Sequence, residues 1–141
     1  MVPMKILIVD DEAVMRELLS TILESYNHEA HTAESGAEAI RKLQDETFDL
    51  VITDLQMSPI DGFAVINHAR QSSDKLLIFL MTGCRDAQCA VDAYRLGADA
   101  FLTKPFSIDE LISHIQFHTI RLLASGQLGI ERLAKPASLS G

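Results

Sequence analysis

The sequence has no long hydrophobic run, no cluster of basic residues and few cysteines. Its longest apolar run, residues 76–81, is far shorter than the roughly 20 residues that a membrane-spanning helix needs. The formal net charge of −8 argues against direct binding to nucleic acid or to a membrane surface. The N-terminal residues 1–5 lack the layout of a signal peptide. We therefore expect a cytoplasmic protein that binds neither nucleic acid nor membrane directly.

The two cysteines, Cys84 and Cys89, are five residues apart, which is neither a CxxC pair nor a zinc-binding pattern. In a reducing compartment both are expected to remain thiols. Cys89 is predicted to be a small buried residue on a helix. Cys84 is predicted to lie in a loop near the candidate site described below, where a modifiable thiol is one reading.

Apolar segments alternate along the chain with segments of helical periodicity. Four runs have the uninterrupted apolar character of strands buried on both faces of a parallel sheet, and a shorter strand is expected at 29–33. The four runs are residues 5–9, 48–53, 76–81 and 100–103. Helices are expected at residues 12–25, 35–46, 63–71, 86–96 and from 107 to about 123. The 141 residues are therefore predicted to fold as one doubly wound α/β domain with a five-stranded parallel sheet.

Local signals place the ends of several helices. Ser35–Glu38 and Ser107–Glu110 have the form of capping boxes, and Gly97 is a plausible C-cap. The predicted inward-facing side chains of the last helix are Ile108, Leu111, Ile112, Ile115, Thr119 and Leu122. His114 and His118 of the same helix are predicted to lie on a solvated face, because no third metal ligand accompanies them.

Polar residues follow four of the predicted strands. Asp10 and Asp11 come directly after the first strand, and Asp54 follows the central one. Thr82 and Lys104 follow the last two strands. Because ligands bind outside the carboxyl ends of parallel strands, we expect these side chains to gather at one edge of the sheet. This convergence is the main indication of function.

Three ionised carboxylates at one edge repel one another and require a countercharge. Mg²⁺ would supply it, since it is typically held by one or two carboxylates together with phosphate oxygens. The Lys104 ammonium and the Thr82 hydroxyl would then stabilise a transferred phosphoryl group. Asp54 is the candidate nucleophile, forming an acyl phosphate.

Together these motifs resemble the receiver domain of two-component response regulators, the CheY-like family. The matching segments are Val9–Asp11, Asp54–Met57, Asp61–Gly62, Met81–Gly83, Gly97–Asp99 and Lys104–Phe106. The resemblance covers residues 4–123 and implies a flavodoxin-like (βα)5 fold with strand order 2-1-3-4-5. Residues 124–141 are predicted to be a C-terminal tail or a linker.

The resemblance implies a role for each matching residue around the carboxylates. Asp54 would be the phosphoacceptor. Asp10, Asp11, Asp54 and the main-chain carbonyl of Gln56 would hold Mg²⁺, for which Mn²⁺ is a potential substitute. The family usually has proline directly after the methionine of this loop, whereas here Ser58 follows and Pro59 comes next; this departure affects the expected metal geometry.

On the other side of the site, the resemblance makes Thr82 the switch hydroxyl and Lys104 the phosphate-contacting lysine. Phe101 matches the switch aromatic, which turns inward when the threonine is drawn to the phosphate; plain core packing is its alternative reading. The bond before Pro105 would be cis. Gln56 and Cys84 occupy the two positions that tune dephosphorylation in the family.

The resemblance also implies partners. A histidine kinase or a histidine phosphotransfer protein would donate the phosphoryl group, docking on the first helix near Met15 and Leu18. Phe117, off the inward stripe of the last helix, is a candidate contact for a downstream effector or output domain, or for a homodimer formed on phosphorylation; a solitary exposed side chain is the alternative. Such a module catalyses its own phosphorylation and dephosphorylation but turns over no diffusible substrate.

Three other functions fit parts of the pattern. An aspartate-nucleophile phosphohydrolase uses similar residues, but typically has two aspartates one residue apart and a cap segment. A flavodoxin-like FMN carrier needs a phosphate-binding loop after the first strand, where Asp10 and Asp11 would repel a phosphate. A receiver that serves only as a non-phosphorylated scaffold is disfavoured by the presence of all five site residues.

Overall fold

The computed structural model describes residues 2–57 and 60–129. In this part of the chain five parallel strands form one sheet in the order β2-β1-β3-β4-β5, which confirms the predicted topology. The strands are β1 Lys5–Val9, β2 Glu29–Ala33, β3 Leu50–Asp54, β4 Leu77–Thr82 and β5 Ala100–Thr103. The helices are α1 Ala13–Ser25, α2 Gly36–Asp45, α3 Gly62–Ser72, α4 Ala87–Leu96 and α5 Ile108–Ser125.

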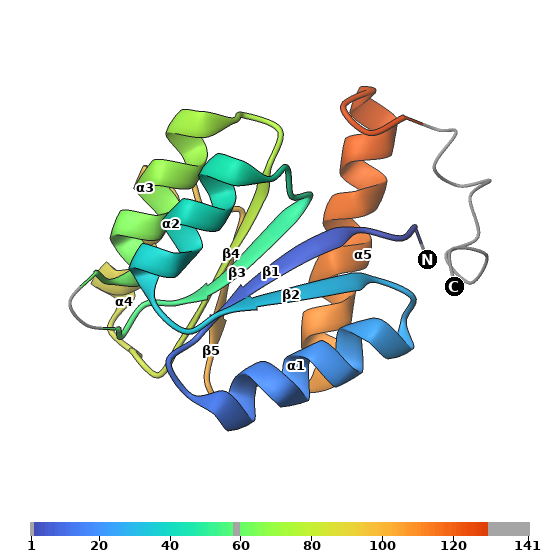
Figure 1. Cartoon of the computed structure of the whole chain (residues 1–141). Helices are drawn as coiled ribbons and strands as arrows, with labels where there is room; N and C mark the ends of the chain where they lie inside the picture. Colours follow the sequence, from blue (N-terminus) through green and yellow to red (C-terminus); the bar gives the residue numbers. More distant parts are fainter. Residues whose placement is uncertain (1, 58–59, 130–141) are drawn as a thin grey trace.

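The helices cover both faces of the sheet (Figure 1), and each face has its own core. Helices α1 and α5 pack on one face, where their apolar side chains meet those of Ile6, Ile8 and Phe79. Helices α2, α3 and α4 pack on the other face against Leu7, Val9 and neighbouring side chains. Every residue of β3 and β4 is buried, because both strands are central and covered on two sides. The predicted doubly wound α/β architecture is therefore confirmed.

The predicted helix ends have the expected caps. The hydroxyl oxygens of Ser35 and Ser107 accept hydrogen bonds from the N–H groups of Glu38 and Glu110, at 3.1 and 3.0 Å. Gly97 ends α4 with φ of 111°, in the left-handed region that favours glycine. The chain direction at these ends is therefore set by local sequence.

The inward stripe of α5 differs from the prediction at two positions. Ile108, the first residue of the helix, is 48% exposed. His118 is only 8% exposed, and its ring lies 5.4 Å from that of Phe79 between centroids. Positions 111, 115, 118 and 122 share one helical face, so the expectation of a solvated His118 was wrong although the spacing held the signal. Leu111, Ile112, Ile115, Thr119 and Leu122 are buried as predicted.

Packing extends past both ends of the segment that resembles a receiver domain. Val2 and Leu128 are buried in the core on the α1 and α5 face, and the Leu128 N–H donates to the carbonyl of Leu122 at 3.1 Å. Residues 130–141, most of the predicted tail, lie outside the described residues. Among the helices of the described residues, none combines the length and the apolar character that crossing a bilayer requires.

A buried histidine gives the fold a predictable pH dependence. His28 is buried, and its Nδ1 accepts a hydrogen bond from the Met4 N–H at 3.1 Å. Burial lowers the pKa of His28 from its ordinary 6.5 to about 4. The unfolded chain therefore binds a proton that the folded chain excludes as the pH falls from 6.5 towards 4. In this window the free energy of unfolding should fall by up to about 1.4 kcal/mol per pH unit.

We expect His28→Asn to remove this dependence, because an asparagine Oδ1 can accept the Met4 N–H without titrating. Urea denaturation at neutral pH and near pH 5 measures the effect. Between the two conditions, the free energy of unfolding should fall by up to about 2 kcal/mol more in the wild type than in the variant. Equal losses in the two proteins would show that His28 does not carry the pH dependence.

Candidate functional site

The carboxyl ends of the strands bring together the predicted polar residues. Asp54 and Thr82 are the last residues of β3 and β4, while Asp10 and Lys104 directly follow β1 and β5. The Lys104 Nζ lies 3.0 Å from Asp10 Oδ2 and 2.9 Å from Asp54 Oδ2. One ammonium group therefore bridges two carboxylates that are 50 and 94 residues away from it in the sequence.

Backbone N–H groups fix both carboxylates in this orientation. Asp10 Oδ1 accepts a hydrogen bond from the Glu12 N–H at 2.9 Å, and Asp54 Oδ1 accepts one from the Gln56 N–H at 3.0 Å. Asp10 is fully buried and Asp54 is 4% exposed. Each carboxylate thus uses one oxygen for the backbone and the other for Lys104, which matches the rule that buried charges are paired and hydrogen-bonded.

The charge of Lys104 is secured by these two partners. Burial alone would lower the pKa of the Lys104 ammonium, but the hydrogen bonds that it donates to Asp54 and Asp10 and the negative charges of these carboxylates outweigh burial and raise the pKa above its usual value. Lys104 is therefore a permanent cation at neutral pH. Its position opposite two acids suits it to contact an anionic group that approaches Asp54.

A hard divalent cation fits the acidic side of the site. Asp10, Asp11 and Glu12 each offer a carboxylate oxygen, and these oxygens all lie within 4.8 Å of one another. Oxygen donors of this kind are the ligands that Mg²⁺ prefers. Glu12 was not among the predicted ligands, although its place next to the Asp pair was a signal for it. The predicted role of the Gln56 carbonyl stays a prediction.

Thr82 is fully buried at the carboxyl end of β4. Its hydroxyl oxygen accepts a hydrogen bond from the Cys84 N–H at 3.2 Å, and its carbonyl accepts one from the Lys104 N–H at 2.7 Å. The peptide bond between Lys104 and Pro105 is cis, as predicted. The segments that carry Thr82 and Lys104 are therefore held together by backbone contacts as well as by the sheet.

The loop after Asp54 closes tightly against its own strand. The Gly62 N–H donates to the Leu55 carbonyl at 3.1 Å. A Cβ at position 62 would lie 2.2 Å from the Asp54 carbonyl oxygen, which no side chain tolerates without a backbone shift. Glycine at this position therefore lets α3 begin directly beside Asp54. Ser58 and Pro59, where the loop departs from the family pattern, lie outside the described residues.

The residues predicted to contact partners differ in exposure. On α1, Leu18 is 51% exposed, whereas Met15 packs partly against the core. Phe117 on α5 is 63% exposed. Phe101 is partly buried against the core of the α2, α3 and α4 face. The partner and switch roles of these side chains stay predictions.

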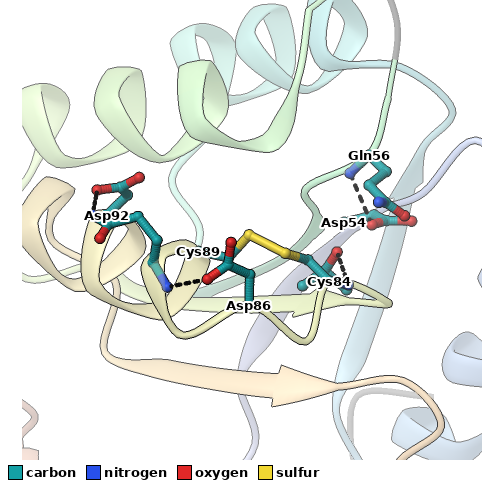
Figure 2. Close-up of a disulfide and its surroundings, with 8 residues drawn as sticks. Asp54, Gln56, Cys84, Asp86, Cys89 and Asp92 are labelled. Atoms are coloured by element: carbon teal, nitrogen blue, oxygen red, sulfur yellow. Dashed lines mark hydrogen bonds between the residues drawn. A yellow bond between two sulfur atoms is a disulfide. The ribbon is translucent and has the colours of Figure 1, made fainter.

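The prediction of two thiols was wrong: Cys84 and Cys89 form a disulfide (Figure 2). Cys89 is also only partly buried. The loop after β4 turns back before α4 and brings the two side chains together, with Cα atoms 6.7 Å apart. Figure 2 shows Cys84 on the side of the bond nearer to Asp54 and Gln56. A spacing of five residues carries no recognised disulfide pattern, so sequence alone gave no signal for it.

Comparison with known proteins gives a consistent match. The family model of the response regulator receiver domain matches residues 6–116. The probable transcriptional regulator ycf27 of Guillardia theta is 38% identical over 112 residues, which are 79% of this chain and 44% of that protein. The regulatory protein AtoC of Escherichia coli K12 is 36% identical over 107 residues, 76% of this chain and 23% of that protein. The chain thus spans less than half the length of these curated relatives.

Solved structures agree with the family match. The response regulator TrrA of Thermotoga maritima, solved in complex with Mg(2+)-BeF, has a TM-score of 0.73 and 34% identity over 80% of this chain and 96% of that chain. A response regulator receiver protein from Pseudomonas putida has a TM-score of 0.75 and 35% identity over 82% of this chain and 97% of that chain. Fold and sequence therefore point to the same group of proteins.

Proposed function

The chain belongs to the response regulator receiver domain family, and on this premise we propose that Asp54 accepts a phosphoryl group in a Mg²⁺-dependent reaction. The observation that supports this proposal best is the Lys104 ammonium, which lies within 3.0 Å of both Asp10 and Asp54. A phosphoryl group on Asp54 would meet a cation on one side and metal-binding carboxylates on the other. Charge developing on its oxygens would be neutralised from both directions.

The transfer is a displacement at phosphorus. A carboxylate oxygen of Asp54 attacks the phosphorus atom, forming an acyl phosphate, while the bond from phosphorus to the donor breaks. The donor leaves with the electron pair of that bond; for a phosphohistidine the leaving group is an imidazole nitrogen, which then takes up a proton. The Lys104 ammonium contacts the equatorial oxygens, where the transition state carries its charge. Hydrolysis of the acyl phosphate by water restores Asp54.

The metal would be held by Asp10 and Asp11, with Asp54 and the Gln56 carbonyl as further ligands and Glu12 beside them. When bound, Mg²⁺ neutralises phosphate oxygens and orients the reacting group. Mn²⁺ would serve in its place because it prefers similar oxygen ligands. Without a divalent cation, the Lys104 ammonium offsets part of the negative charge of Asp10 and Asp54.

We propose a histidine kinase or a histidine phosphotransfer protein as the donor, docking near the exposed Leu18 of α1. Thr82 would then move its hydroxyl towards the phosphoryl group, and Phe101 would turn inward. This change would alter the face of α4, β5 and α5 and so the binding of an effector, of an output domain or of a second copy of the chain through Phe117. The phosphohydrolase alternative is not favoured, because the family match covers both the fold and the site-bearing segment.

Intact-mass spectrometry after incubation with Mg²⁺ and acetyl phosphate tests the proposal. We expect one added phosphoryl group in the wild type, none without Mg²⁺ and none in Asp54→Asn. Asp61→Asn is the matched control, because the Asp61 side chain caps α3 through the Ala64 N–H and asparagine caps equally well. Addition that persists in Asp54→Asn would show that another residue is the nucleophile. No addition in the wild type would indicate a receiver that serves only as a non-phosphorylated scaffold.

A further inference from the structure

The loop between Thr82 and α4 carries a covalent constraint beside the phosphorylation site. The Cys84–Cys89 disulfide closes a ring that contains Arg85, Asp86 and the first two residues of α4. Asp86 caps α4 by accepting a hydrogen bond from the Gln88 N–H at 2.9 Å. The disulfide therefore joins the start of the loop to the first turn of a capped helix, and it restricts the loop to a few conformations.

The same loop makes two hydrogen bonds to residues of the candidate site and passes near a third. The Cys84 N–H donates to the Thr82 hydroxyl at 3.2 Å. The Arg85 Nη2 donates to the Lys104 carbonyl at 3.4 Å. A Cβ at Gly83 would lie 3.8 Å from the Gln56 Oε1, so this residue is near the loop that follows Asp54. A change in the loop conformation would therefore act directly on Thr82.

Both cysteines are placed for thiol–disulfide exchange. Each residue is partly exposed, and its side chain packs against the core on the α2, α3 and α4 face. Cys89 is the third residue of α4, where the helix dipole favours a thiolate over a thiol. Thiolates are the species that attack disulfides. The place of Cys89 in the first turn of α4 and the partial exposure of both residues thus suit a pair that exchanges between the disulfide and the dithiol.

We propose that Cys84 and Cys89 form a reversible redox pair, and that their oxidation to the disulfide weakens the phosphorylation-dependent switch. A small-molecule disulfide is the oxidant. One cysteine thiolate attacks it and releases one small thiolate, giving a mixed disulfide; the second thiolate then attacks the protein sulfur and releases the other. The two cysteine protons end on the two released thiols, so the pair loses two electrons and the small disulfide gains them.

The coupling rests on the proposed function, since it acts through Thr82. In the disulfide form the Cys84 N–H holds the Thr82 hydroxyl in the arrangement described above, and movement of Thr82 towards a phosphoryl group must strain or break this contact. In the dithiol form the loop can follow Thr82. Any ligand that mimics the phosphoryl group on Asp54 should therefore bind the dithiol form more tightly.

The first test measures the redox pair itself. The full chain is equilibrated with mixtures of oxidised and reduced glutathione, quenched with acid, alkylated with iodoacetamide and weighed intact. We expect the chain to change reversibly between a disulfide form with no carbamidomethyl groups and a dithiol form with two. Neither form should carry bound glutathione at the most oxidising or the most reducing ratio. A chain that keeps two free thiols, or ends as a mixed disulfide, at the most oxidising ratio would overturn the proposal.

The second test measures the coupling by calorimetric titration of each form with Mg²⁺ and beryllium fluoride, the combination bound by the Thermotoga relative. We expect about tenfold tighter binding by the dithiol form, a coupling of ordinary size. The Cys84→Ser/Cys89→Ser variant should bind as tightly as the dithiol form, whatever its redox treatment. Equal or tighter binding by the disulfide form would overturn the coupling. Absence of binding in both forms would instead overturn the proposed function, and the coupling with it.

Discussion

Replacing Lys104 with methionine is expected to lower both the free energy of unfolding and the rate of phosphoryl transfer. Methionine fills a similar volume but removes the ammonium that bridges Asp10 and Asp54. Two nearly buried carboxylates are then left without their cation. Breaking a buried ion pair by removing one partner typically costs about 3–5 kcal/mol. We expect a loss of about 3 kcal/mol in the absence of divalent cations.

Mg²⁺ should restore part of this loss, because it would supply a countercharge to the same carboxylates. Chemical denaturation of Lys104→Met with and without Mg²⁺ measures both quantities. The added stability should be larger in Lys104→Met than in the wild type, where the Lys104 ammonium already offsets part of the negative charge of Asp10 and Asp54. An equal gain in both proteins would show that the cation binds away from these carboxylates.

The same variant should accept phosphoryl groups about 100-fold more slowly, the effect of removing one group that stabilises transition-state charge. The rate of mass gain with acetyl phosphate at saturating Mg²⁺ measures this. Lys75→Met is the matched control, since Lys75 is exposed. It should change neither stability nor rate appreciably. A Lys104→Met rate within a few-fold of the control would exclude Lys104 from the transfer step.

Replacing Arg70 with lysine should produce the opposite combination, a large loss of stability with phosphoryl transfer retained. The Arg70 guanidinium donates to the Gly97 carbonyl at 2.8 and 3.2 Å, to the Leu76 carbonyl at 2.9 Å and to Asp99 Oδ2 at 3.0 Å. It also donates to the carbonyls of Ser73 and Asp74. One planar group thus donates hydrogen bonds to carbonyls at the end of α3 and in the segments that lead into β4 and β5.

Lysine keeps the charge but offers no planar set of donors, so most of these carbonyls lose their partner. Asp99 loses the Arg70 contact but keeps the Ile78 N–H and Arg121 as donors. Each unsatisfied buried group costs about 1–3 kcal/mol. Because several of the contacts are only partly buried, we expect a total loss of about 3 kcal/mol. The contacts lie at the amino ends of β4 and β5, the edge away from Asp54. The rate of phosphoryl transfer in the folded protein should therefore stay within about twofold of wild type, a change too small to indicate a lost transition-state contact.

Urea denaturation measures the stability of Arg70→Lys, and Arg41→Lys on the exposed face of α2 is the matched control. Arg41→Lys should change stability by less than about 0.5 kcal/mol. If Arg70→Lys were as mild as this control, the network around Arg70 would not be what ties these segments together.

The sequence by itself determined the strands, most helix ends and the position of the main polar residues of the candidate site. Strands buried on two faces require uninterrupted apolar runs, which makes them visible without a structure. Caps such as Ser35 and Gly97 depend on local backbone geometry, so a few adjacent residues specify them. Asp10, Asp54, Thr82 and Lys104 were found because parallel strands deliver their carboxyl-end residues to one edge.

Only the tertiary structure decided how side chains distant in sequence meet. The Lys104 bridge to Asp10 and Asp54 joins the carboxyl ends of β1, β3 and β5. The Arg70 network joins α3 to the segments that precede β4 and β5. The Cys84–Cys89 disulfide depends on the path of a loop, for which the spacing carries no pattern. The spacing along α5 was enough to place His118 on the buried face, but only the structure shows that its ring packs beside that of Phe79. Contacts of this kind arise from the summed geometry of the fold, whereas propensities and periodicities act over a few residues.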